Sequence, residues 1–544
     1  MDNVVSYPVN RARSNGSVEF QELIELIIER RHQPEDRYEI AAILESMGWN
    51  DTRANLAFGV EDVFELAEEL WEAIRQRVVY TPFTLPDRLV GLKLALDIFK
   101  SFLRGLIFAL PMAISVFAML TLRFSLWSYE KLSIEFATCI AVGTILSFLT
   151  VGGFTQAIAR RGFFYLFQNY YNMARRITFF FIRYGIVACV IISVLLYFVN
   201  LVFNIYPQKM FMIIVLYYFF LSCIWLSVTV MYMLRKELVF TALIVAGIGL
   251  VYLMFVILNI PIVLSQLIAV TLVSITGMGL ALYYFRKAEQ REERGIAPQM
   301  TRLSIMIYAI MPYFIYGLLY FAFLYTDRVI SWSTDHPWDF DQQYMPYFIW
   351  FRGPYELGLD FALLVLMIPL GISEVIVNNL MRDLEISQKS FLGFDYAKMN
   401  RLYRAAYVKM LAVSTATAII SAIIVYNAVL YFNVKYLVYA GKPLLPNDTA
   451  WFVFVISLIA YAILSIGLMN AVIMFSFSQP GFVNRALAPA FAANVLIGFL
   501  LTRWVDYSWG VYGLLIGSVL FTVLTTLSMI KMLGRLDYYL YSAS

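Results

Sequence analysis

Residues 184–203 read YGIVACVIISVLLYFVNLVF, twenty positions without a charged side chain. An α-helix needs about 20 apolar residues to cross the hydrocarbon core of a bilayer. The whole chain shares this character, because 61% of its 544 residues are hydrophobic and only 14% are charged. A soluble globular protein has about 25% charged residues. The composition excludes a soluble enzyme, a disordered chain and a fibrous protein, and it predicts a polytopic membrane protein.

Twelve long apolar runs follow one another from residue 101 onward. Their approximate limits are 101–122, 133–153, 181–203, 210–234, 239–258, 261–285, 303–331, 354–377, 409–432, 449–475, 486–503 and 509–531. The pairs around Pro261 and Tyr507 are closely spaced, so merging or splitting there changes the count by one. We expect an all-α membrane protein with about twelve transmembrane helices.

The first ninety residues have a different composition, with seventeen acidic and nine basic side chains and no run long enough to span a membrane. Apolar residues recur at helical spacing over residues 36–47 and again after Asp62, which is suited to cap a helix. The N-terminus lacks the apolar stretch of a signal peptide. We therefore expect residues 1–90 to form a small acidic helical domain in the cytoplasm.

Lysine and arginine are distributed unequally between alternate loops. If the N-terminus is cytoplasmic, the loops on that side, with the approach to the first span, hold 27 of these bases, and the other side holds eight. Basic residues concentrate in cytoplasmic loops of membrane proteins. Both termini are therefore predicted to be cytoplasmic.

A polar break at residues 286–302, RKAEQREERGIAPQMTR, divides the spans into six and six. The lobes would be residues 91–285 and 303–531, followed by a cytoplasmic tail at 532–544. Pro111 and Pro312 each lie about ten residues into the first span of a half. Two halves that both start inside predict a parallel repeat with a cavity between the lobes.

Ionisable residues inside the spans gather in the second half. Together with three tyrosines at helical spacing they form the candidate cavity for a substrate or a coupling ion: Asp327, Arg328, Glu356, Asp360, Glu374, Tyr313, Tyr316 and Tyr320. A charge at this depth needs a partner, water or a function. One interpretation is a structural ion-pair network, in which Arg328 pairs with Glu356 or Asp360. The other is a site where the acids bind a cation or charged substrate and the tyrosines stack on sugar rings.

The basic loops offer a second candidate site. Arg160, Arg161, Arg175 and Arg176 lie in an aromatic stretch after the second span and could hold a lipid head group or a lipid diphosphate. No P-loop, GxSxG, HExxH or CxxC motif occurs, and the chain has only two histidines and three cysteines. We expect no enzyme activity, no cofactor, no metal site and no nucleic-acid binding.

Two stretches resemble a known family. They are YGLLYFAFLYTDRVISWS at 316–333 and IWFRGPYELGLDFALLVLMIPLG at 349–371. Both are similar to the inner-membrane transport subunit of the Pel exopolysaccharide system, in the polysaccharide branch of the MATE-like MOP flippase superfamily. The matching polar cluster is Asp327, Arg328, Tyr355, Glu356, Gly358 and Asp360. The acidic N-terminal segment departs from the family pattern.

The resemblance implies a MATE-like fold in the bacterial cytoplasmic membrane and export, by alternating access, of a polysaccharide or lipid-linked saccharide. It also implies a cytoplasmic glycosyltransferase and other membrane subunits as partners. Two alternatives stay open: a MATE-like exporter of cationic drugs, and a membrane scaffold that recruits a glycosyltransferase without transporting anything.

Overall fold

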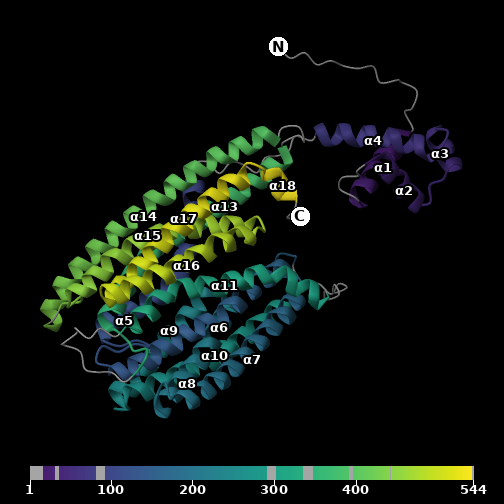
Figure 1. The fold of residues 1–544 in the computed structure, drawn as a ribbon. Helices are drawn as coiled ribbons and strands as arrows, with labels where there is room; N and C mark the ends of the chain where they lie inside the picture. Colours follow the sequence, from purple (N-terminus) through teal and green to yellow (C-terminus); the bar gives the residue numbers. More distant parts are fainter. Residues whose placement is uncertain are drawn as a thin grey trace. The chain divides into compact units, whose positions relative to one another are not determined.

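The computed structural model describes residues 16–30, 36–80, 92–168, 170–290, 302–334, 347–390, 396–441 and 443–541. Within these ranges all regular structure is helical apart from one isolated bridge between Phe124 and Tyr129. Contacts divide the chain into two units, Met1–Leu89 and Val90–Ser544. Helix labels are those of Figure 1.

The N-terminal unit consists of four short helices, α1 Gly16–Arg30, α2 Arg37–Ser46, α3 Asp51–Phe58 and α4 Val63–Tyr80. Their starts follow from capping: Asp36, Asn50 and Asp62 each accept a hydrogen bond from the backbone N–H three residues on. The predicted cap at Asp62 is thus observed. The apolar faces meet in one core, which includes Ile27, Ile40, Leu44, Leu66 and Leu70.

The second unit carries the membrane-spanning helices. Eleven of its described helices are long and apolar enough to cross a bilayer, and the bent α5 makes a twelfth. They are α5 Leu92–Leu122, α6 Ile134–Phe167, α7 Tyr171–Phe203, α8 Gln208–Met233, α9 with a π-turn Glu237–Ile257, α10 Ile262–Glu289, α11 Leu303–Trp332, α12 and α13 Gly353–Ser390, α14 Tyr396–Ala440, α15 Asp448–Ser476, α16 Pro480–Trp504 and α17 Val511–Leu533. A short α18, Leu536–Tyr541, follows. The predicted all-α multi-pass membrane protein is confirmed.

Two of the spans break close to a proline. In α5 the axis bends by 57° between Ile107 and Leu110, just before Pro111. Proline removes one backbone donor and clashes with the preceding turn. The matching helix of the second half, α11, runs unbroken through Pro312. The second break is in the next span, where a 3-10 turn at Leu364–Leu366 separates α12 from α13, three residues before Pro369.

The helices pack as two groups. One core joins α11 to α17 and runs from Tyr316 to Leu536. Other cores join α6, α7, α8 and α10, and the first turns of α11 also pack into one of these, through Met306 and Ile310. Figure 1 shows α11 beside α6, between the two groups.

Close approach at glycine makes the α6–α11 seam. A Cβ at Gly317 would lie 2.2 Å from the carbonyl oxygen of Gly152, and one at Gly153 would lie 2.7 Å from the ring of Phe314. Small residues let transmembrane helices approach in this way. A second seam joins α5 to α13, where a Cβ at Gly105 would lie 2.7 Å from the Cα of Gly371.

Because successive helices are joined by short segments, their ends alternate between two sides of the bundle. We call the side with the α6–α7, α8–α9 and α10–α11 connections the basic end. The side with the α5–α6, α7–α8 and α11–α12 connections is the opposite end.

Candidate functional site

Four of the predicted residues meet near the opposite end, where α11 finishes and α12 begins. The Arg328 Nε donates to Glu356 Oε1 at 2.7 Å, and its Nη2 lies 3.8 Å from Asp360 Oδ1. One turn of helix separates the two acids, so both face the same guanidinium. Asp327 is next to Arg328 in sequence and accepts a hydrogen bond from the Tyr355 hydroxyl at 2.9 Å. We call Asp327, Arg328, Glu356 and Asp360 the outer charge cluster.

Packing fixes the helices that carry this cluster. A Cβ at Gly358 would lie 2.7 Å from the carbonyl oxygen of Ala450, so glycine is needed for α12 to approach α15. Arg503 caps the C-terminus of α11 by donating to the carbonyls of Ile330 and Ser333. A cation is favoured at that end of a helix. The recurrent Gly358 of the resemblance thus has a structural role.

The outer charge cluster has more negative than positive charge. Three carboxylates surround one guanidinium, which gives a formal charge of −2 when all are ionised. Within the described ranges, the buried carboxylate oxygens Asp327 Oδ1 and Glu356 Oε2 have no hydrogen-bond partner. Uncompensated buried charge is unfavourable. The arrangement can therefore accept a proton, a cation or a donor group.

The cluster is closed on one side and open on the other. The exposed fraction of the side chain is 3% for Arg328 and 16% for Glu356, but it is 58% for Asp360. Asp327 is fully buried. Asp360 is therefore the member of the cluster that the protein covers least.

Aromatic stacking connects the cluster to the other helix group. The Arg328 guanidinium lies 5.0 Å from the ring centre of Tyr325, which stacks on Phe148 of α6 at 5.4 Å. Phe148 also stacks on Trp225 of α8 at 4.4 Å. Tyr325, Phe148 and Trp225 do not stand out in the sequence, because aromatic residues are common throughout this chain and only the fold brings these three together.

The predicted tyrosines share a helix face, as their spacing requires, but that face packs against α15. Tyr313 and Tyr316 are buried and contact the ring of Phe475, at 5.6 and 4.6 Å between ring centres. Tyr320 is half-buried and stacks on Tyr316. Tyr320 is thus the most exposed of the three.

Glu374 does not join the outer charge cluster. It lies on α13, fourteen residues beyond Asp360, and accepts a hydrogen bond from Asn378 at 3.2 Å. A helix rises about 1.5 Å per residue, so the two acids are about 20 Å apart along the axis. Glu374 instead lies at the α5–α13 seam, beside Gly105.

The four predicted arginines do not form one site. Arg160 donates to Ser478 at 2.5 Å and lies over the Tyr313 ring, so it joins the two helix groups. Arg175 pairs with Glu289 at 3.2 Å. Arg161 lies over the ring of Phe164, and Arg176 is exposed. In the parts of the chain that the structure describes, no three acidic, histidine or cysteine residues form a group suited to a metal ion.

Comparison with solved structures identifies the architecture. The eukaryotic MATE transporter AtDTX14 aligns over 82% of this chain and 99% of its own, with a TM-score of 0.55 at 11% identity. This chain has the MATE fold. The Vibrio cholerae MATE transporter VcmN, in its bent form, aligns over 82% of this chain and 98% of its own, with a TM-score of 0.53 at 13% identity.

A third match is a MOP superfamily transporter from Pyrococcus furiosus, in which a reversed polarity of the binding pocket suggests a different function. It aligns over 80% of this chain and 96% of its own, with a TM-score of 0.53 at 12% identity. No family model and no curated protein matches the sequence. At these identities the comparison establishes the fold, and a shared fold does not specify a substrate.

Proposed function

We propose that this protein is a membrane transporter that exports or flips a polysaccharide or a lipid-linked saccharide by alternating access. One observation carries the proposal: a half-open, net-negative charge cluster lies beside the seam between the two helix groups of a MATE fold. The stretches that resemble the Pel transport subunit are the ones that build this cluster. The basic end would face the cytoplasm of a bacterium.

The outer charge cluster would act as the coupling element. When Asp360 is exposed, water stabilises its carboxylate, but closure of the cavity would remove that water. A proton or a cation bound to the cluster would lower the cost of closure. Because such a ligand binds the two conformations with different affinity, it shifts their populations. The gradient of that ion would then drive transport.

Aromatic side chains near the cluster suit a saccharide. Tyr320, Phe321 and Tyr325 lie on α11 near the seam, and Phe148 faces two of them from α6. Aromatic rings offer large apolar faces with defined orientation, on which sugar rings can stack. Partner subunits, including a cytoplasmic glycosyltransferase, would deliver the polymer or its lipid-linked unit.

A second candidate is export of cationic drugs, favoured by the same negative charge together with aromatic rings. A test that separates the two uses a deletion strain of the source bacterium, complemented with wild type or with Asp360→Asn at equal membrane levels. Secreted hexose polymer and efflux of ethidium are both measured.

We expect the deletion to abolish secreted polymer, wild type to restore it, and Asp360→Asn to restore less than a tenth. Ethidium efflux should not change. Unchanged polymer with lost ethidium efflux would overturn the saccharide proposal in favour of the drug exporter. If Asp360→Asn restored secreted polymer fully, saccharide export would stand, but the proposed role of Asp360 in ion coupling would be refuted.

A further inference from the structure

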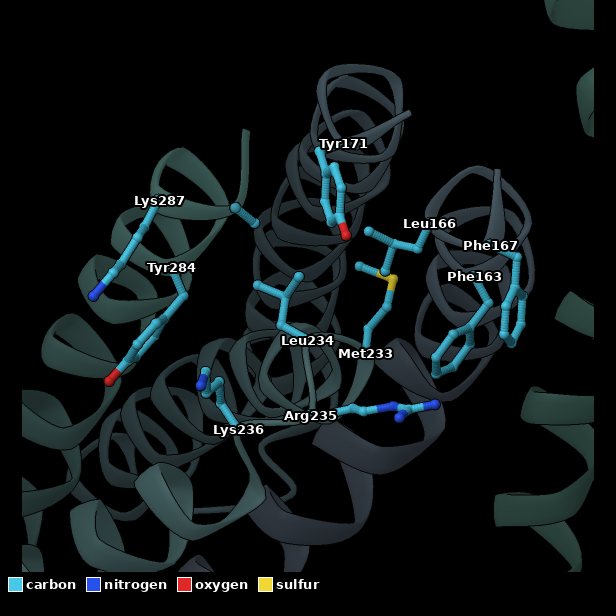
Figure 2. Close-up of a pocket in the computed structure, with 11 residues that line it drawn as sticks. Phe163, Leu166, Phe167, Tyr171, Met233, Leu234, Arg235, Lys236, Tyr284 and Lys287 are labelled. Carbon is cyan, nitrogen blue, oxygen red and sulfur yellow. The ribbon is translucent and has the colours of Figure 1, made fainter. Parts of the chain in front are cut away.

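A basic pocket lies at the basic end of the first helix group, at the other end of the bundle from the outer charge cluster. Its volume is about 400 Å³, within the range of roughly 300–1,000 Å³ of small-molecule sites. Four helices contribute to it: α6, α7, α8 with the turn that follows, and α10 (Figure 2). The lining residues are Phe163, Leu166, Phe167, Tyr171, Met233, Leu234, Arg235, Lys236, Tyr284, Lys287 and Ala288.

The lining of this pocket contains three cations and no acid. Among the described residues no carboxylate pairs with Arg235, Lys236 or Lys287. Of the neighbouring acids, Glu289 pairs with Arg175 at 3.2 Å, and Glu237 lies in the first turn of α9, where a negative charge is favoured. Counting only the residues that the structure describes, the lining of this pocket therefore carries a net positive charge.

The backbone at Arg235 has an unusual conformation. Its φ is +56°, in the left-handed region that glycine adopts without cost. Helices commonly end with glycine at this position. Figure 2 shows the Arg235 side chain beside the pocket, extending beneath Phe163. Replacement of Arg235 by glycine would therefore remove this charge without adding backbone strain.

The other wall of the pocket is apolar. Phe163 and Phe167 of α6 are 37% and 77% exposed, and Leu166, Met233 and Leu234 lie between them and the two lysines, Lys236 and Lys287. On the left of Figure 2, Lys236 lies over Tyr284, with its Nζ 5.7 Å from the ring centre. Cations next to exposed aromatic and aliphatic groups match an amphiphile with an anionic head and an apolar tail.

We propose that this pocket binds a phosphate-bearing anionic group, attracted by the positive charge of Lys236 and Lys287 on one side of the pocket and of Arg235 on the other (Figure 2). Phosphate accepts strong charge-assisted hydrogen bonds from arginine and lysine. Basic pockets between transmembrane helices on the cytoplasmic side suit phospholipid head groups. The group comes from a membrane phospholipid or from free phosphate, and the binding site does not depend on which saccharide or drug the cavity carries.

Native mass spectrometry of the purified full chain tests this proposal. The probe is dioleoylphosphatidylglycerol, with dioleoylphosphatidylcholine as the neutral comparison. Each charge removed should weaken retention of the anionic lipid about fivefold. The variants are Arg235→Gly, which also relaxes the backbone, Arg235→Gly with Lys287→Gln, and Ala288→Trp, which fills the pocket and keeps every charge. The control is Lys209→Gln, an exposed base at the opposite end of α8.

We expect selective binding of one phosphatidylglycerol, graded loss in the charge variants, loss in Ala288→Trp and no change in Lys209→Gln. If 10 mM inorganic phosphate displaces the lipid from wild type, the pocket takes free phosphate as well; if not, the membrane lipid is its ligand. Equal binding by wild type and Ala288→Trp would overturn the proposal, because the lipid would then bind the basic surface without using the pocket. Equal binding by the double charge variant would overturn it as well.

Discussion

Replacement of Arg328 by methionine removes the one cation of the outer charge cluster and leaves three carboxylates. Breaking a buried ion pair by removing one partner costs about 3–5 kcal/mol, whereas an exposed pair contributes about 0–1 kcal/mol. The Arg328 and Glu356 side chains are 3% and 16% exposed and 2.7 Å apart, so the buried value applies to them. Asp360 is 58% exposed at 3.8 Å, so the exposed value applies there.

The structure thus predicts an order of stability. Arg328→Met should lower the free energy of unfolding by about 3–5 kcal/mol, and Asp360→Asn by less than about 1 kcal/mol. Adding Glu356→Gln to Arg328→Met should restore part of the loss, because it removes one of the unpaired charges. Arg401→Met, at an exposed position on α14, should stay within about 0.5 kcal/mol of wild type.

Unfolding in mixed micelles with increasing dodecyl sulfate, followed by tryptophan fluorescence, measures these differences. The reasoning fails if Arg328→Met unfolds like Arg401→Met. It also fails if the double variant is less stable than Arg328→Met alone, because the two side chains would then not be coupled in the way their geometry requires.

Three further predictions use the same unfolding measurement. Gly317→Val should lower the free energy of unfolding by about 1–3 kcal/mol because its Cβ would meet the backbone of α6, while Gly279→Ala, with open space around it, should not destabilise; equal effects would contradict the close approach of α6 and α11. Asn494→Ala should lower the free energy of unfolding by about 0.6–1.7 kcal/mol, because it removes one hydrogen bond to the backbone carbonyl of Phe323 in α11. A loss above about 3 kcal/mol would contradict this assignment of a single hydrogen bond. Arg235→Gly should be as stable as wild type or up to about 1 kcal/mol more stable, because glycine adopts the positive φ of this position without strain. A clear loss of stability would show that the backbone at Arg235 is not strained.

The spans could be predicted from the sequence because the bilayer sets the length of an apolar run. Each of the twelve predicted runs corresponds to one membrane-spanning segment. Most are single α-helices, and three of them include a short 3-10 or π turn. The limits of the helices were harder to predict. The structure extends α6 to Phe167 and α14 over Tyr396–Ala440, well beyond the apolar runs at 133–153 and 409–432. Polar residues at a membrane surface can continue a helix without appearing in an apolar run. Neither the 57° bend of α5 nor the 3-10 turn before Pro369 was predicted.

The candidate site was only partly predictable. Helical periodicity placed Glu356 and Asp360 on one face, and the pairing of Arg328 with Glu356 was one of the two interpretations. Periodicity does not say which neighbour covers a face, and for that reason the packing of Tyr316 against Phe475 was not foreseen. The basic pocket could not be predicted from the sequence, because Arg235 and Lys287 are far apart in the chain and come to line one pocket only in the fold.

In the mechanism proposed above, the two helix groups move relative to each other under control of the outer charge cluster. Lys209 of α8 and Lys435 of α14 are exposed at the opposite end, one on each group, and the three native cysteines are buried. Spin labels at Lys209→Cys and Lys435→Cys in nanodiscs allow the distance between the groups to be measured by pulsed electron resonance.

We expect two distances in wild type, one for each conformation. The ratio of their populations should change when pH is lowered or sodium is added. In Asp360→Asn that ratio should no longer respond. A single distance that stays the same under all of these conditions, in both proteins, would contradict the account.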